Sequence, residues 1–227
     1  MAALDTAAET APELGFAERI RTQTDAAHRR TEQSRFVGEL LAGNLSSAAH
    51  AALIGQTYLV YRTLEDAGRS HANHPVVAPF LGDELLRTPA LEADLEFLLG
   101  GQWRERVTPS PATARYIDRL EEVAFDWPAG FVAHHYIRYL GDLSGGQIIR
   151  RMLERAYGYE TDGLRFYIFD RIEKPKLYKD AYRAKLDEAP LSAEEQQRLI
   201  DEVNLAYDLN GALFADLEAD LDTYLVK

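Results

Sequence analysis

The sequence predicts a single all-α domain of about eight helices. Apolar residues recur every three or four positions, as at Phe16, Ile20 and Ala27, which is the period of an amphipathic helix. Alternating β-branched runs are nearly absent, and the one short candidate, residues 165–169, is expected to form a loop or a helical turn. No Pro/Gly/Ser-rich linker and no internal repeat divides the chain, so one domain is expected.

Capping residues indicate where several helices begin. In chain order the predicted starts are Ser46–Ser47, Thr88–Pro89, Ser110–Pro111, Asp126–Pro128, and Ser192 with Glu195. Ser or Thr followed by Pro is typical of an N-cap and the first helical position. Ser192 with Glu195 is a capping box and predicts a final helix that runs to about Tyr224.

Composition excludes several classes of function. The formal net charge is -12, and an acidic chain repels nucleic acid and anionic lipid. The absence of cysteine excludes disulfides, thiolate haem ligation and cysteine nucleophiles and suits the cytoplasm. No apolar run approaches the ~20 residues that span a bilayer. Residues 1–13 contain no secretory signal and are interpreted as a disordered leader, so the domain is expected at 14–227.

One segment carries a net positive charge although the chain as a whole is acidic. Residues 165–185 contain seven Lys or Arg against three Asp or Glu. Such a stretch is either an ordinary solvated helix face or a docking surface for an acidic partner.

Three glycines interrupt a predicted long helix over residues 131–157. Gly141, Gly145 and Gly146 each cost about 1 kcal/mol relative to alanine inside a helix. Gly141 and Gly145 lie on one face, where they favour a kink and a groove for a flat ligand, or close packing of another helix. Arg138 and Asp142 lie beside this groove. They form either an exposed i,i+4 pair or a polar site that holds water near a ligand.

His28 has neighbours that suit a metal ligand. Glu32 is one helical turn later, where its carboxylate can reach the second imidazole nitrogen and orient the ring. Arg21 is two turns earlier and can meet a ligand carboxylate. Asp25-x-x-His28 also fits half of a di-iron site, but the second carboxylate-x-x-His that such a site needs is missing.

These segments resemble the haem oxygenase family over about residues 14–217. Residues 136–147 (YIRYLGDLSGGQ) are similar to the family's distal-helix signature, and residues 22–32 (TQTDAAHRRTE) to its proximal helix. Residues 58–67, 178–183 and 204–217 resemble the segments that supply a distal tyrosine, basic haem clamps and the last core helix. Two positions depart from the family pattern: Arg21 replaces a frequent lysine, and Tyr207 replaces phenylalanine.

The resemblance implies that haem b lies between the proximal N-terminal helix and the glycine-kinked distal helix. His28 is then the axial iron ligand and Glu32 its support. Gly141 and Gly145 leave room for O2 and the porphyrin, while Asp142 anchors water that delivers a proton to the bound oxygen. The resemblance also assigns Arg138, Tyr61 and Asn210 to that polar network, and it assigns the remaining haem contacts to Arg21, Tyr136, Lys179, Arg183 and Phe214.

The implied activity is oxidative cleavage of haem to biliverdin, CO and ferrous iron with O2 and an external reductant. The expected protein is a cytoplasmic monomer that binds neither nucleic acid nor membrane, and whose redox partner is of the ferredoxin or reductase type. Two alternatives stay open. A non-catalytic haem carrier or sensor needs His28 but neither Asp142 nor the glycine pair. A thiamin-degrading or di-iron enzyme lacks its cysteine or its second metal motif.

Overall fold

The computed structural model describes residues 14–226, so the predicted leader, residues 1–13, lies outside the described residues. Within this range the secondary structure is helical, apart from an isolated bridge between Leu45 and Leu225. The α-helices are α1 (Phe16–Glu32), α2 (Arg35–Leu41), α3 (Ser47–Ser70), α4 (Thr88–Leu99), α5 (Trp103–Arg106), α6 (Pro111–Val123), α7 (Pro128–Ser144), α8 (Gly146–Tyr157), α9 (Pro175–Asp187), α10 (Ala193–Ala219) and α11 (Leu221–Tyr224). Two short 3-10 helices are η1 (Ala78–Phe80) and η2 (Arg165–Tyr167). The predicted all-α class is confirmed. Within residues 14–226 the structure has eleven α-helices where about eight were expected, because some are short.

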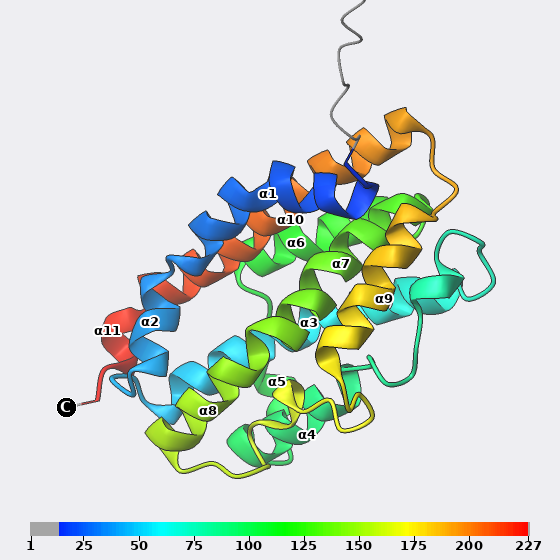
Figure 1. Cartoon of the computed structure of the whole chain (residues 1–227). Coiled ribbons are helices and arrows are strands. Elements are labelled where there is room, and N and C mark those ends of the chain that lie inside the picture. The colour runs from blue at the N-terminus through cyan, green and yellow to red at the C-terminus, as the bar shows by residue number, and fades with distance from the viewer. Residues whose placement is uncertain (1–13, 227) are drawn as a thin grey trace, which may run out of the picture.

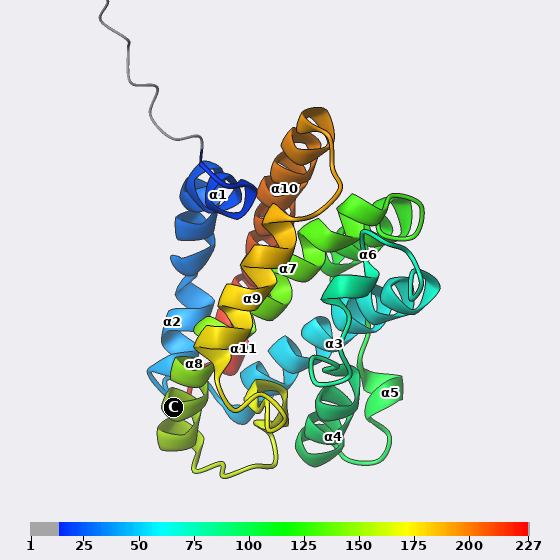
Figure 2. The same ribbon diagram turned by 45° about the vertical axis from the view of Figure 1, so that its right-hand side comes forward.

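Helix α7 lies at the centre of the molecule. It packs against α10, which in turn carries α1 on its other side (Figures 1 and 2). Helix α3 packs against α4 and α6 and crosses behind α7 in Figure 1. Helices α1 and α10 thus form a layer beside α7, and α9 contacts both α1 and α7 (Figure 2).

Helices begin at or next to the predicted capping residues, but α4 already begins at Thr88, so Arg87 and not Thr88 is its N-cap. Ser110 and Ser192 accept hydrogen bonds from the backbone N–H groups of Thr113 and Glu195, each at 3.2 Å. Such a bond satisfies one of the orphan donors at a helix N-terminus. The Glu195 carboxylate accepts from Trp127 Nε1 at 2.8 Å. This side chain therefore ties α10 to the start of α7.

Two predicted helices are shorter than expected. The predicted helix over residues 131–157 is divided at Gly145, between α7 and α8. The glycine run weakens the helix there, because glycine stabilises helical backbone least among residues other than proline. The predicted last helix ends at Ala219, and α11 follows after Asp220. The segment around residue 165 forms η2, as its sequence predicts.

None of the helices in residues 14–226 combines the length and the apolar character that crossing a bilayer requires.

Candidate haem site

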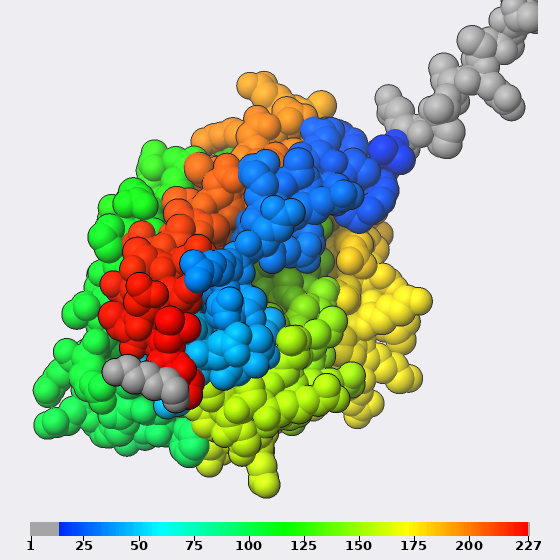
Figure 3. All heavy atoms as spheres, turned by 90° about the vertical axis from the view of Figure 1, so that its left-hand side faces the viewer, coloured from blue at the N-terminus to red at the C-terminus, as the bar shows by residue number. Residues whose placement is uncertain are grey.

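A cavity of about 610 Å³ opens between α1 and the α7–α8 pair. Figure 3 views the molecule from this side, where the surface is hollowed between the blue α1–α2 region and the green α7–α8 region. Side chains of α10 also line the cavity. Eleven of the thirteen predicted haem and catalytic residues line the cavity: Arg21, His28, Glu32, Tyr136, Arg138, Gly141, Asp142, Gly145, Arg183, Asn210 and Phe214.

 Tyr61 and Lys179 are the two predicted residues that do not line the cavity.

The glycines of the distal wall border open space. A Cβ atom added to Gly141 would meet no atom within 4 Å, and one added to Gly145 would lie 3.6 Å from the Gly141 carbonyl oxygen. Close helix–helix packing would instead place a neighbouring helix against these positions. The packing interpretation of the glycine pair is therefore wrong, and the bare backbone of α7 faces the cavity.

A polar network lies behind this backbone. Arg138 donates from Nη1 to Asn210 Oδ1 at 2.5 Å, and its guanidinium carbon lies 4.9 Å from the centroid of the Tyr61 ring. The Tyr61 hydroxyl donates to the Asp142 carboxylate. Arg138 is buried, so the interpretation of Arg138 and Asp142 as an exposed ion pair is also wrong. The buried Arg138 Nε has no hydrogen-bond partner among the described residues.

Asp142 is the titratable group at the centre of this network. Burial raises the pKa of its carboxyl group to about 6, although the positive charge of Arg138 and the hydrogen bond from Tyr61 act in the opposite direction. Part of Asp142 stays open to the cavity. A carboxylate with a pKa near neutrality can hold or release a proton under mild conditions, so Asp142 is the candidate proton-handling group.

Tyr61 reaches the cavity through Asp142. Its ring is fully buried and makes edge contacts with Tyr139 and Phe166, at centroid distances of 5.3 and 5.4 Å. These contacts fix the phenol, because close-packed aromatic rings have few alternative rotamers.

The proximal wall is more open. The His28 side chain is 47% exposed, and its Nε2 lies 3.5 Å from the Glu32 carboxylate. Glu32 is itself 63% exposed, which makes this a weak contact. The ring of Tyr207, the position that departs from the family pattern, meets the His28 ring edge-on at 5.4 Å.

Cationic side chains border the cavity. Arg21 and Arg183 line it, and each pairs with a carboxylate on its own helix: Arg21 with Glu18 at 2.5 Å and Arg183 with Asp180 at 3.0 Å. Tyr136 lines the same cavity; burial raises the pKa of its phenol, while the charges of Arg183 and Arg21 act against that increase. Lys179 donates to the Ser144 hydroxyl at 2.8 Å and reaches the cavity only through that residue.

Sequence reasoning missed the wall formed by Phe166 and Tyr167 of η2. The buried Asp94 carboxylate holds this turn by accepting from the backbone N–H groups of Arg165 and Phe166, at 2.9 and 2.8 Å. Arg87, also buried, donates to the Ile168 carbonyl at 2.7 Å. The aromatic run of residues 165–169 in an otherwise charged segment was the available signal.

The back of α7 is held by a second buried polar cluster that the sequence did not reveal. His134 Nε2 lies 2.9 Å from the Glu202 carboxylate, which also pairs with Arg119 at 2.6 Å. The hydrogen bonds from His134 and Arg119 outweigh burial and lower the pKa of Glu202 to about 2. This cluster ties α6, α7 and α10 together beneath the site.

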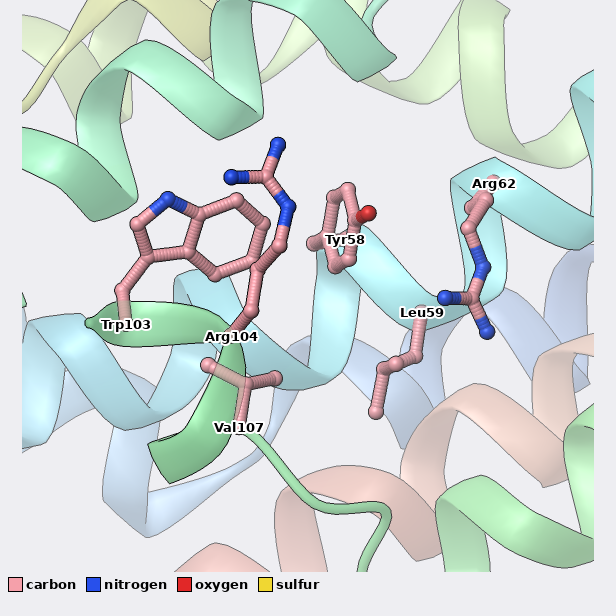
Figure 4. Close-up of a pocket in the computed structure, with 6 residues that line it drawn as sticks. All are labelled: Tyr58, Leu59, Arg62, Trp103, Arg104 and Val107. Atoms are coloured by element: carbon pink, nitrogen blue, oxygen red, sulfur yellow. The ribbon is translucent and has the colours of Figure 1, made fainter. Parts of the chain in front are cut away.

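A second pocket lies on α3 and α5. Figure 4 shows its six lining residues, among them Arg62, Arg104 and the indole of Trp103. It measures about 160 Å³ and contains no histidine or carboxylate in its lining. It therefore offers no imidazole for a haem iron, and it is much smaller than the cavity between α1 and α7–α8.

The large cavity has the features that haem requires. One wall offers an imidazole, the opposite wall offers backbone without side chains at Gly141, and arginines stand at the edge where propionates need cations. No group of three or more His, Cys, Asp or Glu within residues 14–226 is placed to hold a metal ion directly, which leaves the di-iron alternative without geometric support.

Comparisons with known proteins agree with this geometry. Residues 14–216 match the family model described as heme oxygenase. The chain is 38% identical to a heme oxygenase of Pyropia yezoensis over 90% of this chain and 86% of that protein, and 35% identical to heme oxygenase 1 of Synechocystis over 92% and 87%. The crystal structure of the Synechocystis heme oxygenase-1 in complex with heme has a TM-score of 0.87 and covers 92% of this chain and 95% of that one. The chain therefore belongs to the haem oxygenase family.

Proposed function

We propose that the protein cleaves haem to biliverdin, CO and ferrous iron in the cavity between α1 and α7–α8, with O2 and electrons from an external reductant. The observation that carries this proposal is Asp142, a carboxyl group with a pKa near 6 that lies beside the open backbone of Gly141. A haem pocket built only for storage needs the imidazole but has no use for a buried acid at that position.

His28 is the residue proposed to bind the haem iron. Its ring faces the cavity from α1 and stays half exposed, so ligation requires no change in the core. Haem held by this imidazole would supply the site where O2 is activated. Glu32, whose carboxylate lies 3.5 Å from His28 Nε2, would help to orient the imidazole.

Asp142 is proposed to hold the water that delivers a proton on the distal side. The carboxylate receives a hydrogen bond from Tyr61 and the electrostatic support of Arg138. Asn210 in turn fixes the Arg138 guanidinium. A preorganised network of this kind places a proton without reorganisation during the reaction.

The bare backbone at Gly141 and Gly145 is proposed to accommodate the distal face of the ring and its oxygen. Arg21, Arg183 and Tyr136, together with Lys179, are the proposed contacts of the propionates, and Phe214 packs on the ring from α10. Charge-assisted hydrogen bonds orient a carboxylate as well as bind it. The orientation of haem in turn selects the carbon that is attacked.

A turnover assay tests the function. Protein loaded with one equivalent of haemin is given a reductant and O2, and products are separated by chromatography. Loss of the Soret absorption with formation of biliverdin and CO is the expected result. A Soret band that persists through repeated reduction and reoxidation would favour the carrier or sensor alternative.

The proposed electron donor is an acidic redox protein of the ferredoxin or reductase type, and the basic segment 165–185 is its proposed docking site. Arg171, Lys174 and Lys176 are exposed there, beside the exposed apolar side chain of Leu177. Attraction between opposite charges increases the rate of encounter and weakens with salt.

Charge reversal tests this partner surface. Lys174→Glu with Lys176→Glu should slow haem reduction by ferredoxin and remove most of its salt dependence. Arg115→Glu on α6, also an exposed basic residue, is the matched control. Equal rates in both variants would refute docking at 165–185.

The monomeric state and the cytoplasmic location stay predictions, which sedimentation and cell fractionation can test.

A further inference from the structure

A continuous row of aromatic rings leads from Tyr61, behind the distal wall, to the C-terminal end of α8. Tyr61 contacts Phe166 at a centroid distance of 5.4 Å, and Phe166 contacts Tyr167 at 4.9 Å. Tyr167 lies 6.4 Å from His50. His50 lies next to two further tyrosines of the α8 end. The chain after α8 runs past α4 at the bottom of Figure 1, and this is where the row ends.

The last rings of the row reach the surface. His50 is 6.5 Å from Tyr157 and 5.8 Å from Tyr159, and these two tyrosines stack at 5.5 Å with an interplanar angle of 16°. Tyr157 and Tyr159 are half-buried, whereas Tyr61, Tyr167 and His50 are buried. No gap between successive rings exceeds 6.5 Å, so electrons can cross the protein in short steps.

The chemistry of these rings goes beyond what packing requires. Four of the six are phenols, which lose an electron more readily than any aliphatic core residue. His50 Nε2 lies 2.7 Å from the Gly163 carbonyl oxygen, so Nε2 carries the proton and Nδ1 is the free acceptor. Nδ1 is buried and has no partner among the described residues. An unpaired buried acceptor costs stability, and here it stands among three tyrosines that release a proton when oxidised.

We propose that this row, Tyr61–Phe166–Tyr167–His50–Tyr157/Tyr159, carries oxidising equivalents out of the haem cavity when peroxide reacts there without productive cleavage. The inference rests on the proposed function, because the oxidant forms at haem bound in the cavity. Electrons move from the surface tyrosines toward the cavity, so the oxidation ends on partly exposed side chains that do not line the cavity.

The atoms balance for hydrogen peroxide as the oxidant. One H2O2 accepts two electrons and two protons and becomes two waters. Tyr157 and Tyr159 each lose one electron and one phenol proton, which together supply the two electrons and two protons that the peroxide takes up. The Tyr157 hydroxyl donates to the carbonyl oxygens of Leu40 and Leu45, at 3.2 and 2.8 Å, so its proton leaves when this contact opens. In the absence of a reductant the two radicals join through one new C–C bond, which gives a dityrosine after the second proton of each ring shifts to its oxygen. Within the row, the Tyr61 proton goes to Asp142 and back.

Peroxide labelling tests the proposal. Haem-loaded protein receives one equivalent of H2O2 without reductant, in the presence of a nitroso spin trap, and peptide mass spectrometry locates the label. Electron paramagnetic resonance of rapidly frozen samples follows the tyrosyl radical. The proposal predicts label or dityrosine on Tyr157 and Tyr159. Label distributed equally over half-buried tyrosines outside the row, such as Tyr224 and Tyr178, would overturn it.

The double variant Tyr157→Phe/Tyr159→Phe keeps both rings and removes both phenols. We expect loss of the surface label, retention of the radical on Tyr167 or Tyr61, and unchanged haem turnover. Tyr224→Phe is the matched control and should leave the labelling unchanged. An unchanged radical distribution in the double variant would refute the row. Haem binding, followed by the Soret band, distinguishes failure of this inference from failure of the proposed function. If haem binds and is cleaved but no label reaches Tyr157 or Tyr159, only this inference is wrong.

Discussion

The two walls of the cavity are built differently. The proximal wall on α1 presents half-exposed side chains, His28 among them, which are held by weak contacts such as the 3.5 Å approach of Glu32. The distal wall on α7 presents backbone, and behind it Arg138, Tyr61 and Asp142 form a largely buried network. The proximal wall can therefore adjust when a ligand enters, whereas the distal wall is already arranged.

This difference separates binding from chemistry. A ligand atom that bonds to iron gains its order from the bond itself, so His28 needs little support beforehand. A proton donor must be in place before the reacting oxygen arrives, since only preorganised groups lower a barrier without reorganisation. The distal wall meets this need at a cost, because a buried carboxyl group and unpaired polar atoms such as Arg138 Nε reduce stability.

The largest expected effect is on the proximal wall. His28→Ala removes the proposed axial nitrogen, and we expect biliverdin formation to fall by more than about 100-fold, because loss of even an outer partner of a metal ligand commonly costs ~10–100-fold. Optical and electron paramagnetic resonance spectra of the haem complex check the ligation, and added imidazole should restore part of the activity. An unaltered nitrogen-ligand spectrum would mean that another residue binds the iron.

Asp142→Asn tests the distal network. Haem should still bind, while biliverdin formation falls by about 100-fold, the lower end of what a positioned acid or base contributes. Because the pKa of Asp142 is raised to about 6, the wild-type rate should decrease as the pH falls through 6, and the variant should lack this limb. Haem cleavage at the wild-type rate would contradict the proton-handling role.

The same variant has a second consequence for stability. A carboxyl group whose folded pKa lies above its unfolded value binds protons preferentially in the folded state, so its contribution decreases as the pH rises from about 4 to 6. Asp142→Asn should therefore raise the free energy of unfolding of the haem-free protein at pH 7. Urea denaturation at pH 5 and pH 7 measures this change.

Glu202→Gln tests the support beneath the distal wall. Removing the buried carboxylate leaves His134 without its partner and leaves Arg119 with only the exposed Glu122, and breaking such a cluster costs about 3 kcal/mol of unfolding free energy. The Glu202 pKa of about 2 lies below its unfolded value, so its stabilisation is present above about pH 4.5 and is lost as the pH falls toward 2. The variant should show a flatter acid limb in urea titrations. Arg29→Gln, which breaks an exposed pair with Asp25 on α1, is the control and should change stability by less than about 0.5 kcal/mol.

The smallest expected changes in stability come from alanine substitutions at two glycines, Gly141 and Gly158, which should act in opposite directions. A Cβ at Gly141 or at Gly158 meets no atom within 4 Å, but only Gly158 has a positive φ, of 70°. Gly141→Ala should stabilise the haem-free protein by up to about 1 kcal/mol and weaken haem binding, since the new methyl group enters the cavity. Gly158→Ala should destabilise it by about 1 kcal/mol and leave haem binding unchanged. Urea denaturation measures the stability of each variant, and haem titration measures its affinity for haem. If Gly141→Ala destabilised the protein, this glycine would be needed for the local structure of α7 and not only for space in the cavity.

The sequence by itself determined the helical class, the starts of five helices and several residues that line the cavity. Periodicity and capping act over a few residues, so Ser110 and Ser192 indicate their helices without reference to the rest of the chain. The glycine run and the spacing of Glu32 from His28 are local patterns of the same kind. The resemblance of residues 136–147 then added the roles that spacing left open.

Tertiary structure decided which of the alternative interpretations was correct. Only the packed molecule showed that Gly141 faces a cavity instead of a helix, and that Arg138 is buried beside Tyr61, which lies 77 residues earlier in the chain. Glu202, His134 and Asp94 act through partners on other helices or turns, and no local pattern encodes such pairs. The raised pKa of Asp142 has the same origin, because burial is a property of the packed chain and the sequence gives only the residue to be buried.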